Sequence, residues 1–175
     1  MIRKFRKWLI PALFVLWAML IFFFSSQTYE EQRISPFLGQ LNTPFLYEKL
    51  GGISFMYGGL EVSVHTAGVA GFLEFFIRKG AHLIIFFVFG FLTISVWRTF
   101  VKNGVISSLG ALLCVLFYAS ADELHQKFTG GRTPLWQDVM LDTFGGLLGI
   151  LCFLIINRRR KRHSMISLYI STPYK

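Results

Sequence analysis

Residues 80–97 read GAHLIIFFVFGFLTISVW, a run that contains no Lys, Arg, Asp or Glu. An apolar helix of roughly 17 to 25 residues is long enough to cross the hydrocarbon core of a bilayer. Three further runs, residues 8–24, 104–121 and 139–156, have a similar length and a similar apolar character. The sequence therefore predicts an all-α, polytopic membrane protein with four transmembrane helices.

The composition of the whole chain supports this prediction. Of its 175 residues, 54% are hydrophobic and only 15% are charged. A soluble domain of this size would leave much of that apolar surface facing water. The net charge of +9 does not indicate nucleic-acid binding, because the basic residues gather at the ends of spans and form no stripe between base-stacking aromatic residues.

The distribution of Lys and Arg predicts the orientation of the spans. Residues 1–7, the connection between the second and third spans, and the tail at 158–175 together carry 12 of these residues, whereas the segments on the opposite side carry 6. The positive-inside rule therefore places both termini in the cytoplasm. We divide the chain into a four-helix membrane domain, residues 1–157, and a basic cytoplasmic tail, residues 158–175. A cleaved signal peptide at the first span is disfavoured by Pro11 and by the lack of a small-x-small cleavage site.

Residues 25–78 form the only sizeable connection between spans, and its prolines and paired glycines predict turns around short elements. The last part of this connection, residues 62–77, is strongly apolar. It is predicted to lie along the membrane surface or to extend the second span outward, and a re-entrant helix is also compatible with its composition.

Ionisable residues gather at one end of the second, third and fourth spans. The third span closes with DELHQ at residues 122–126, and the neighbouring spans and the following loop add Arg78, Lys79, His82, Arg132, Asp138 and Asp142. The predicted topology brings all of them to the outer face. Ionisable groups in or beside hydrocarbon are costly unless they are paired or lie in a wet cavity, so their presence there indicates a functional site.

Helical spacing places several of these residues on shared faces. Arg78 and Lys79 precede His82 by four and three residues, so one face of a helix would present all three. In the fourth span, positions 138, 142, 145 and 149 form a single stripe. The pair Gly145 and Gly149 permits close approach of another helix, which would press the residue at 142 against that neighbour.

Two kinds of chemistry suit this cluster. The cations Arg78, Lys79 and Arg132 are suited to hold a phosphate or pyrophosphate headgroup, with a carboxylate or histidine moving a proton. Alternatively, a divalent cation could be held by donors among Asp122, Glu123, Asp138, Asp142, His82 and His125. The spacing is not diagnostic of a metal. A purely architectural network is a third interpretation, although the cluster has more charged groups than helix locking requires.

The same residues resemble a known family. The pattern Lys79-x-x-His82, Asp122-Glu123-x-x-Gln126, Gly131-Arg132, Asp138 and Asp142-x-x-Gly145-x-x-x-Gly149 is similar to that of the VanZ-like family of small bacterial membrane proteins, as is Phe24-Ser25-Ser26-Gln27. The resemblance extends over residues 8–156. This chain departs from it at Ile85 and Phe86, where many members have a Glu and a Tyr.

The resemblance implies a multi-pass protein of the bacterial cytoplasmic membrane, in a cell-envelope setting. It also implies a link to antibiotic resistance, in the form of lowered susceptibility to the glycopeptide teicoplanin. It supplies no catalytic activity, so the roles of the residues rest on their chemistry.

We therefore predict an outward-facing polar site that binds an anionic, lipid-linked envelope molecule, with a membrane lipid or a lipid-linked envelope precursor as the partner and no nucleic acid. The proposed catalytic residues are Asp122, Glu123 and His82. The proposed ligand-binding residues are Arg78, Lys79, Gln126, Arg132, Asp138 and Asp142. No cofactor is predicted, with a divalent cation as the alternative, and the sequence leaves open whether the site is catalytic.

A second hypothesis is a non-catalytic membrane scaffold or accessory subunit whose polar cluster docks a partner protein. Ion or proton passage is disfavoured, because the inner halves of the spans offer no ionisable relay.

Overall fold

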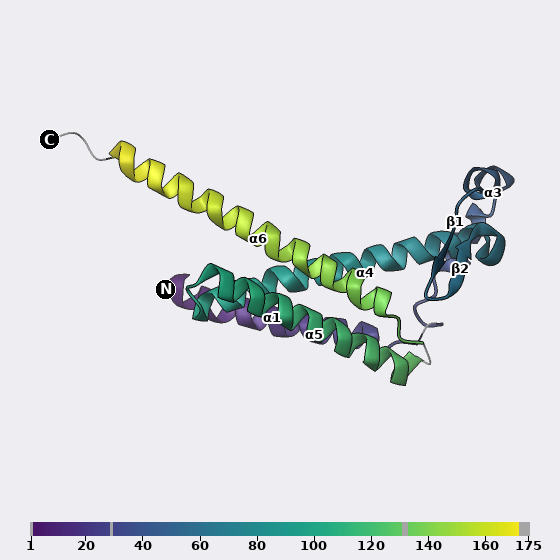
Figure 1. The fold of residues 1–175 in the computed structure, drawn as a ribbon, viewed down its shortest axis with the longest axis horizontal. Helices are drawn as coiled ribbons and strands as arrows, with labels where there is room; N and C mark the ends of the chain where they lie inside the picture. The colour runs from purple at the N-terminus through teal and green to yellow at the C-terminus, as the bar shows by residue number, and fades with distance from the viewer. Residues whose placement is uncertain (1, 29, 131–132, 172–175) are drawn as a thin grey trace.

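Four long helices dominate the computed structural model, which describes residues 2–28, 30–130 and 133–171 (Figure 1). They are α1 (Ile2–Ser25), α4 (Val64–Phe100), α5 (Gly104–Gly130) and α6 (Trp136–Ser171). Each contains a stretch long and apolar enough to cross a membrane, namely Trp8–Ser25, Val64–Phe100, Gly104–Thr129 and Trp136–Arg159. The prediction of an all-α protein with four membrane-spanning helices is confirmed.

The four helices share one apolar core. Its buried members come from every long helix and are Ile21, Phe86, Phe89, Ile94, Ala111, Val115, Ala119 and Ile150. Helix α4 supplies the largest side chains of this core and packs against α1, α5 and α6. It is therefore the central helix of the bundle.

Helices α4 and α6 approach each other closely because glycines line their interface. A Cβ atom added to Gly149 would lie 1.9 Å from the carbonyl oxygen of Phe87, and one added to Gly145 would lie 2.5 Å from the carbonyl oxygen of Leu83. Only a hydrogen fits at either position. The close approach predicted from the glycine stripe is thus confirmed, and it brings the start of α6 against α4.

Short elements fill the connection between α1 and α4, and we call this connection the lobe. It contains α2 (Ser35–Leu38), the 3-10 helix η1 (Gly39–Leu41), α3 (Pro44–Leu50) and an antiparallel hairpin of β1 (Ser54–Tyr57) and β2 (Leu60–Ser63). The hairpin turns at Gly58 and Gly59, whose φ angles of 59° and 81° suit glycine in a tight two-residue turn. Figure 1 shows the lobe beside the N-terminal end of α4.

The second predicted span is the C-terminal part of the longer helix α4. This helix begins at Val64 and bends at Gly68, where φ is 67° and ψ is 171°. The side-chain oxygen of Asn42 accepts a hydrogen bond from the Ala70 amide at 3.1 Å, so the backbone just after the bend is satisfied. At 1.5 Å per residue, 37 residues extend about 55 Å, which exceeds the roughly 30 Å of the hydrocarbon core. Residues 64–77 of the apolar segment therefore continue the second span toward the lobe, whereas residues 62–63 belong to β2.

The ends of the bundle differ in character. The start of α1, the connection between α4 and α5, and the far end of α6 lie at one end, and the lobe lies at the other (Figure 1). The basic segments of the sequence share the first end. The placement of this basic end in the cytoplasm remains the prediction of the charge count.

Candidate functional site

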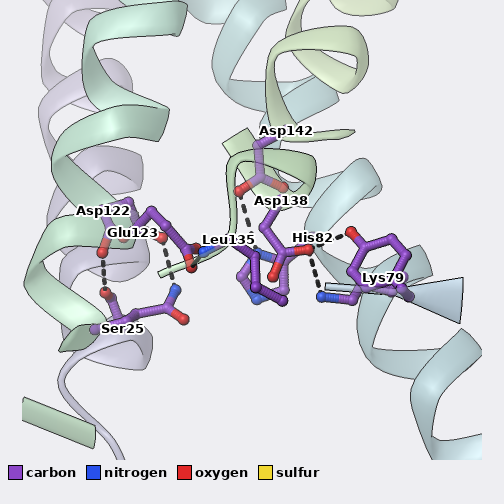
Figure 2. Close-up of polar contacts among 10 residues, drawn as sticks. Ser25, Lys79, His82, Asp122, Glu123, Leu135, Asp138 and Asp142 are labelled. Carbon is purple, nitrogen blue, oxygen red and sulfur yellow. Dashed lines mark hydrogen bonds and ion pairs between the residues drawn. The ribbon is translucent and has the colours of Figure 1, made fainter. Parts of the chain in front are cut away.

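Polar side chains from all four long helices gather at the lobe end of the bundle (Figure 2). We call this group the polar layer, and its members are Ser25, Lys79, His82, Asp122, Glu123, Gln126, Asp138 and Asp142. Several are deeply buried, with Asp122, Glu123 and Asp142 exposed to only 6%, 7% and 2%. Buried carboxylates are costly without partners, so the contacts of each group decide what the layer can do.

The close packing of α4 and α6 produces a contact between His82 and Asp142. His82 Nδ1 lies 3.3 Å from Asp142 Oδ2. The second oxygen of this carboxylate, Oδ1, is buried and has no hydrogen-bond partner among the described residues. Asp142 was predicted to lie about one helical turn below Asp138. One of its two carboxylate oxygens meets no donor in the described part of the chain.

A second pair joins α4, α6 and the hairpin. Lys79 Nζ lies 2.5 Å from Asp138 Oδ1, and the Tyr57 hydroxyl donates to the same oxygen. Lys79 Nζ also lies 4.8 Å from the centroid of the Tyr57 ring, within the range of a cation–π contact. Burial, followed by the hydrogen bond and charge of Asp138, raises the pKa of the Tyr57 hydroxyl above its ordinary value. Tyr57 is therefore held as a neutral donor.

Three hydrogen bonds lie at the end of α5, one within the helix and two to neighbouring elements. The side-chain amide of Gln126 donates to Asp122 Oδ2 at 2.9 Å, and the hydroxyl of Ser25 on α1 donates to the backbone oxygen of Asp122 at 3.4 Å. Glu123 Oε1 accepts a hydrogen bond from the Leu135 amide at 2.7 Å, just before α6 begins. These bonds tie α5 to α1 on one side and to α6 on the other.

Three groups from different helices converge within the layer. His82 of α4, Asp122 of α5 and Asp142 of α6 each offer one donor atom, and these atoms lie within 4.8 Å of one another. Beside them is a small recess of about 30 Å³, partly open to the outside. It is lined by the polar residues Ser25, Gln32, His82, Asp122 and Gln126 and by the apolar residues Ile21, Phe24, Ile85 and Phe86.

Some of the proposed residues lie elsewhere. Arg78 lies 4.0 Å from Glu74, whose carboxylate also accepts hydrogen bonds from the backbone amides of Ile34 and Ser35. The long Arg78 side chain thus pairs with the preceding helical turn, although its spacing from His82 had suggested a shared face. His125 meets the hydroxyl of Ser26 at 3.1 Å, outside the convergent group. Arg132 lies outside the residues that the structure describes.

Sequence reasoning did not anticipate Tyr57. The hairpin turn packs against Leu135, so closely that a Cβ at Gly58 would lie 2.7 Å from that side chain. This contact brings the last residue of β1 to Asp138. The paired glycines between two short β-prone segments predict such a turn, but nothing in the local pattern indicates which helix end it will meet.

The charge balance of the described layer is negative. Among its described residues, Lys79 is the only permanently charged cation, and Asp138 already pairs with it. The carboxylates of Asp122, Glu123 and Asp142 exceed the positive charge available from His82. A ligand that carries positive charge, or brings a cation with it, would therefore be stabilised here.

Together, the fold and the site define a membrane protein of four spanning helices with a buried polar layer near one end of its bundle. A family model described as VanZ/LLP1 matches residues 11–157, which include three of the four predicted spans and most of the first. The chain belongs to the VanZ/LLP1 family, and the resemblance drawn from its motifs is confirmed. No curated protein and no solved structure matches the chain.

Proposed function

We propose that this protein is an envelope protein of the bacterial cytoplasmic membrane that binds the headgroup of an anionic, lipid-linked molecule in its polar layer. The observation that carries the proposal is the small recess beside His82 and Asp122, whose lining combines polar and apolar side chains. A lipid-linked ligand likewise combines a polar headgroup with an apolar chain.

Donors suited to a phosphate lie within and beside the recess. Ser25, Gln32 and Gln126 line it and carry hydroxyl or amide groups, and His82 adds an imidazole. Lys79 lies three residues before His82 on the same helix and pairs with Asp138, and we propose that a bound phosphate would share its ammonium group. Arg132, outside the described residues, belongs to the same proposal on the strength of its position in the sequence.

The layer also contains groups suited to proton transfer. His82 is held by Asp142 at 3.3 Å, and Asp122 lies across the convergent group. A histidine oriented by a carboxylate is a common general acid or base. We propose His82, Asp122 and Glu123 as the residues that would move a proton to or from the bound headgroup.

Native mass spectrometry of the purified full chain tests the binding proposal. The probes are a polyprenyl phosphate and the neutral polyprenol of the same chain length. We expect the phosphate to bind at least about tenfold more tightly than the alcohol, and His82→Gln to remove most of that preference. His65→Gln is the matched control, because His65 is exposed in the first turn of α4 and contacts Tyr47 at 2.7 Å. Equal binding of phosphate and alcohol by the natural chain would refute the proposal.

The link to glycopeptides needs a cellular assay. We propose that expression of the protein lowers the susceptibility of a bacterial host to teicoplanin. His82→Gln is expected to return the inhibitory concentration to that of the empty vector, while His65→Gln preserves the effect. Immunoblots of membrane fractions must show equal amounts of both variants. If both variants protect as well as the natural chain, the polar layer is not the source of the phenotype.

A scaffold or accessory-subunit role remains the second proposal, and one observation favours it. The lobe exposes four large apolar side chains, Phe37, Phe45, Met56 and Leu60, to between 66% and 85%. Such a surface suits contact with a partner protein or with the membrane surface. A phenotype that is lost with Phe37→Ser and Leu60→Ser but kept with His82→Gln would favour this role over ligand binding in the layer.

A further inference from the structure

The three convergent residues His82, Asp122 and Asp142 are the part of the polar layer whose contacts are least complete. Their donor atoms come from three helices and lie within 4.8 Å of one another. The two aspartates are buried, with 6% and 2% exposure. Two buried carboxylates at this separation repel each other unless a positive charge lies between them.

Among the described residues, too little positive charge lies at this point. Lys79 is paired with Asp138 at 2.5 Å, and Arg78 lies beside Glu74. His82 can contribute one charge at most, against the two of Asp122 and Asp142. A divalent cation would balance both carboxylates while leaving the histidine neutral, which is the form that binds metals.

An unpartnered atom points to the same conclusion. Asp142 Oδ1 is buried and meets no hydrogen-bond donor among the described residues, although Asp142 Oδ2 contacts His82. A buried carboxylate oxygen without a donor costs free energy that a bound cation would offset. The observation is independent of the clustering, because it concerns the lack of a donor at one atom.

From these observations we propose that His82, Asp122 and Asp142 form a binding site for a divalent transition-metal cation of the Mn²⁺ or Zn²⁺ kind. One imidazole and two carboxylates suit these ions, whereas Ca²⁺ prefers six to eight oxygen ligands. Two donors bound to one ion at about 2.1 Å can be at most about 4.2 Å apart. The widest of their present spacings, up to 4.8 Å, would therefore have to shorten on binding.

Neighbouring contacts already hold these ligands in place. Gln126 donates to Asp122 Oδ2 at 2.9 Å, which restrains this carboxylate. The glycine contacts between α4 and α6 set the separation of His82 and Asp142. Supporting hydrogen bonds of this kind commonly contribute 10- to 100-fold to metal affinity. The remaining positions on the ion would face the recess that His82 and Asp122 line.

This inference deepens the proposed function and rests on it for its biological meaning, since a divalent cation here would neutralise the two carboxylates of Asp122 and Asp142. With the ion bound, His82 and Asp122 would be its ligands, and Glu123 would be the proposed residue that moves a proton. A phosphate headgroup would then meet a metal ion and the donors of the recess. The metal would act as a bridge between the acidic residues and the anionic ligand.

Mn²⁺ binding to the purified full chain in detergent tests the site without any lipid. Electron paramagnetic resonance measures the free Mn²⁺ signal as protein is added, and Zn²⁺ and Ca²⁺ are then added as competitors. We expect about one Mn²⁺ bound per chain, displaced by Zn²⁺ and not by equal Ca²⁺. Asp142→Asn and His82→Gln are each expected to weaken the affinity at least about 100-fold, and Gln126→Leu about tenfold.

Glu74→Gln is the matched control. Glu74 is a carboxylate on α4, buried to the same 2% exposure as Asp142, and eight residues before His82. Its substitution should leave Mn²⁺ affinity unchanged. The inference is overturned if the natural chain takes up no Mn²⁺, or if Glu74→Gln lowers the affinity as much as Asp142→Asn does.

Folding of each variant is checked by size-exclusion chromatography and circular dichroism. If Asp142→Asn does not accumulate, Asp122→Asn replaces it. If neither variant accumulates, the competition of Zn²⁺ and Ca²⁺ for the Mn²⁺ site of the natural chain decides the question. Lipid binding is measured separately with and without a chelator. If the natural chain binds no Mn²⁺ but still prefers the phosphate to the alcohol, the metal site alone is refuted. If it binds Mn²⁺ but shows no preference for the phosphate, only the proposed function is refuted.

Discussion

Gly149→Ala is expected to destabilise the bundle, because the new methyl group has no room at the contact of α6 with α4. Its Cβ would lie 1.9 Å from the carbonyl oxygen of Phe87, while ordinary van der Waals contact begins at 3.4 Å. The two helices must therefore separate by roughly 1.5 Å at this point. Overpacking of this kind typically costs about 1–3 kcal/mol. The same separation would move Asp142 away from His82.

The matched control is Gly80→Ala on α4. No atom outside its own helix lies within 4 Å of a Cβ added there, so the substitution changes helix propensity without changing packing. It is expected to stabilise the protein by about 0.5–1 kcal/mol, because glycine is unfavourable inside a helix.

Both variants can be compared with the natural chain by reversible unfolding in mixed detergent micelles. The expected order of stability is Gly80→Ala above the natural chain and Gly149→Ala clearly below it. If Gly149→Ala unfolds within about 0.5 kcal/mol of the natural chain, the helices are not held at the backbone contact that the structure describes, and the geometry of the polar layer loses its foundation.

Three further predictions concern the polar layer and its orientation. Asp138→Asn should lower the free energy of unfolding by about 1–3 kcal/mol, because Lys79 loses a charged partner; adding Lys79→Met should cost less than the sum of the single changes, and simple additivity would exclude the pair as a coupled unit. The free energy of unfolding of the natural chain should fall as the pH rises above about 10, because unfolded tyrosines then release their proton whereas the raised pKa of Tyr57 keeps it protonated in the fold. Tyr57→Phe should reduce this fall, and an unchanged pH profile would contradict the assignment. In a background without the native cysteines, a membrane-impermeant maleimide should label Gln40→Cys in intact cells and Lys102→Cys only after lysis, and the reverse pattern would overturn the predicted orientation.

The sequence predicted the parts of this fold that follow from local pattern. Runs of apolar residues indicated the four spans, and the spacing of Gly145 and Gly149 indicated a close helix contact. In both cases, the cause lies within one helix, in its length or in its small residues. The pairing of His82 with Asp142 follows from that contact, because His82 is adjacent to Leu83, which Gly145 contacts, and Asp142 lies about one turn before Gly145.

Contacts that depend on the lobe could not be predicted in the same way. The partner of Arg78 is Glu74, which also binds the backbone at residues 34 and 35, and this choice depends on how the lobe folds against α4. Tyr57 reaches Asp138 only because the hairpin turn meets Leu135. Helical periodicity describes one element at a time, whereas these contacts depend on the path of a connection with little periodicity of its own.

The hydrogen bond from Tyr57 to Asp138 links the hairpin directly to the first turn of α6 in the membrane bundle. Asp138 is shared between the hairpin and Lys79, so lifting the hairpin away from α6 removes one of the two donors that balance this carboxylate. The remaining lysine can then reorient more freely. A displacement of the lobe would therefore change the hydrogen bonding and charge balance of Asp138 in the first turn of α6.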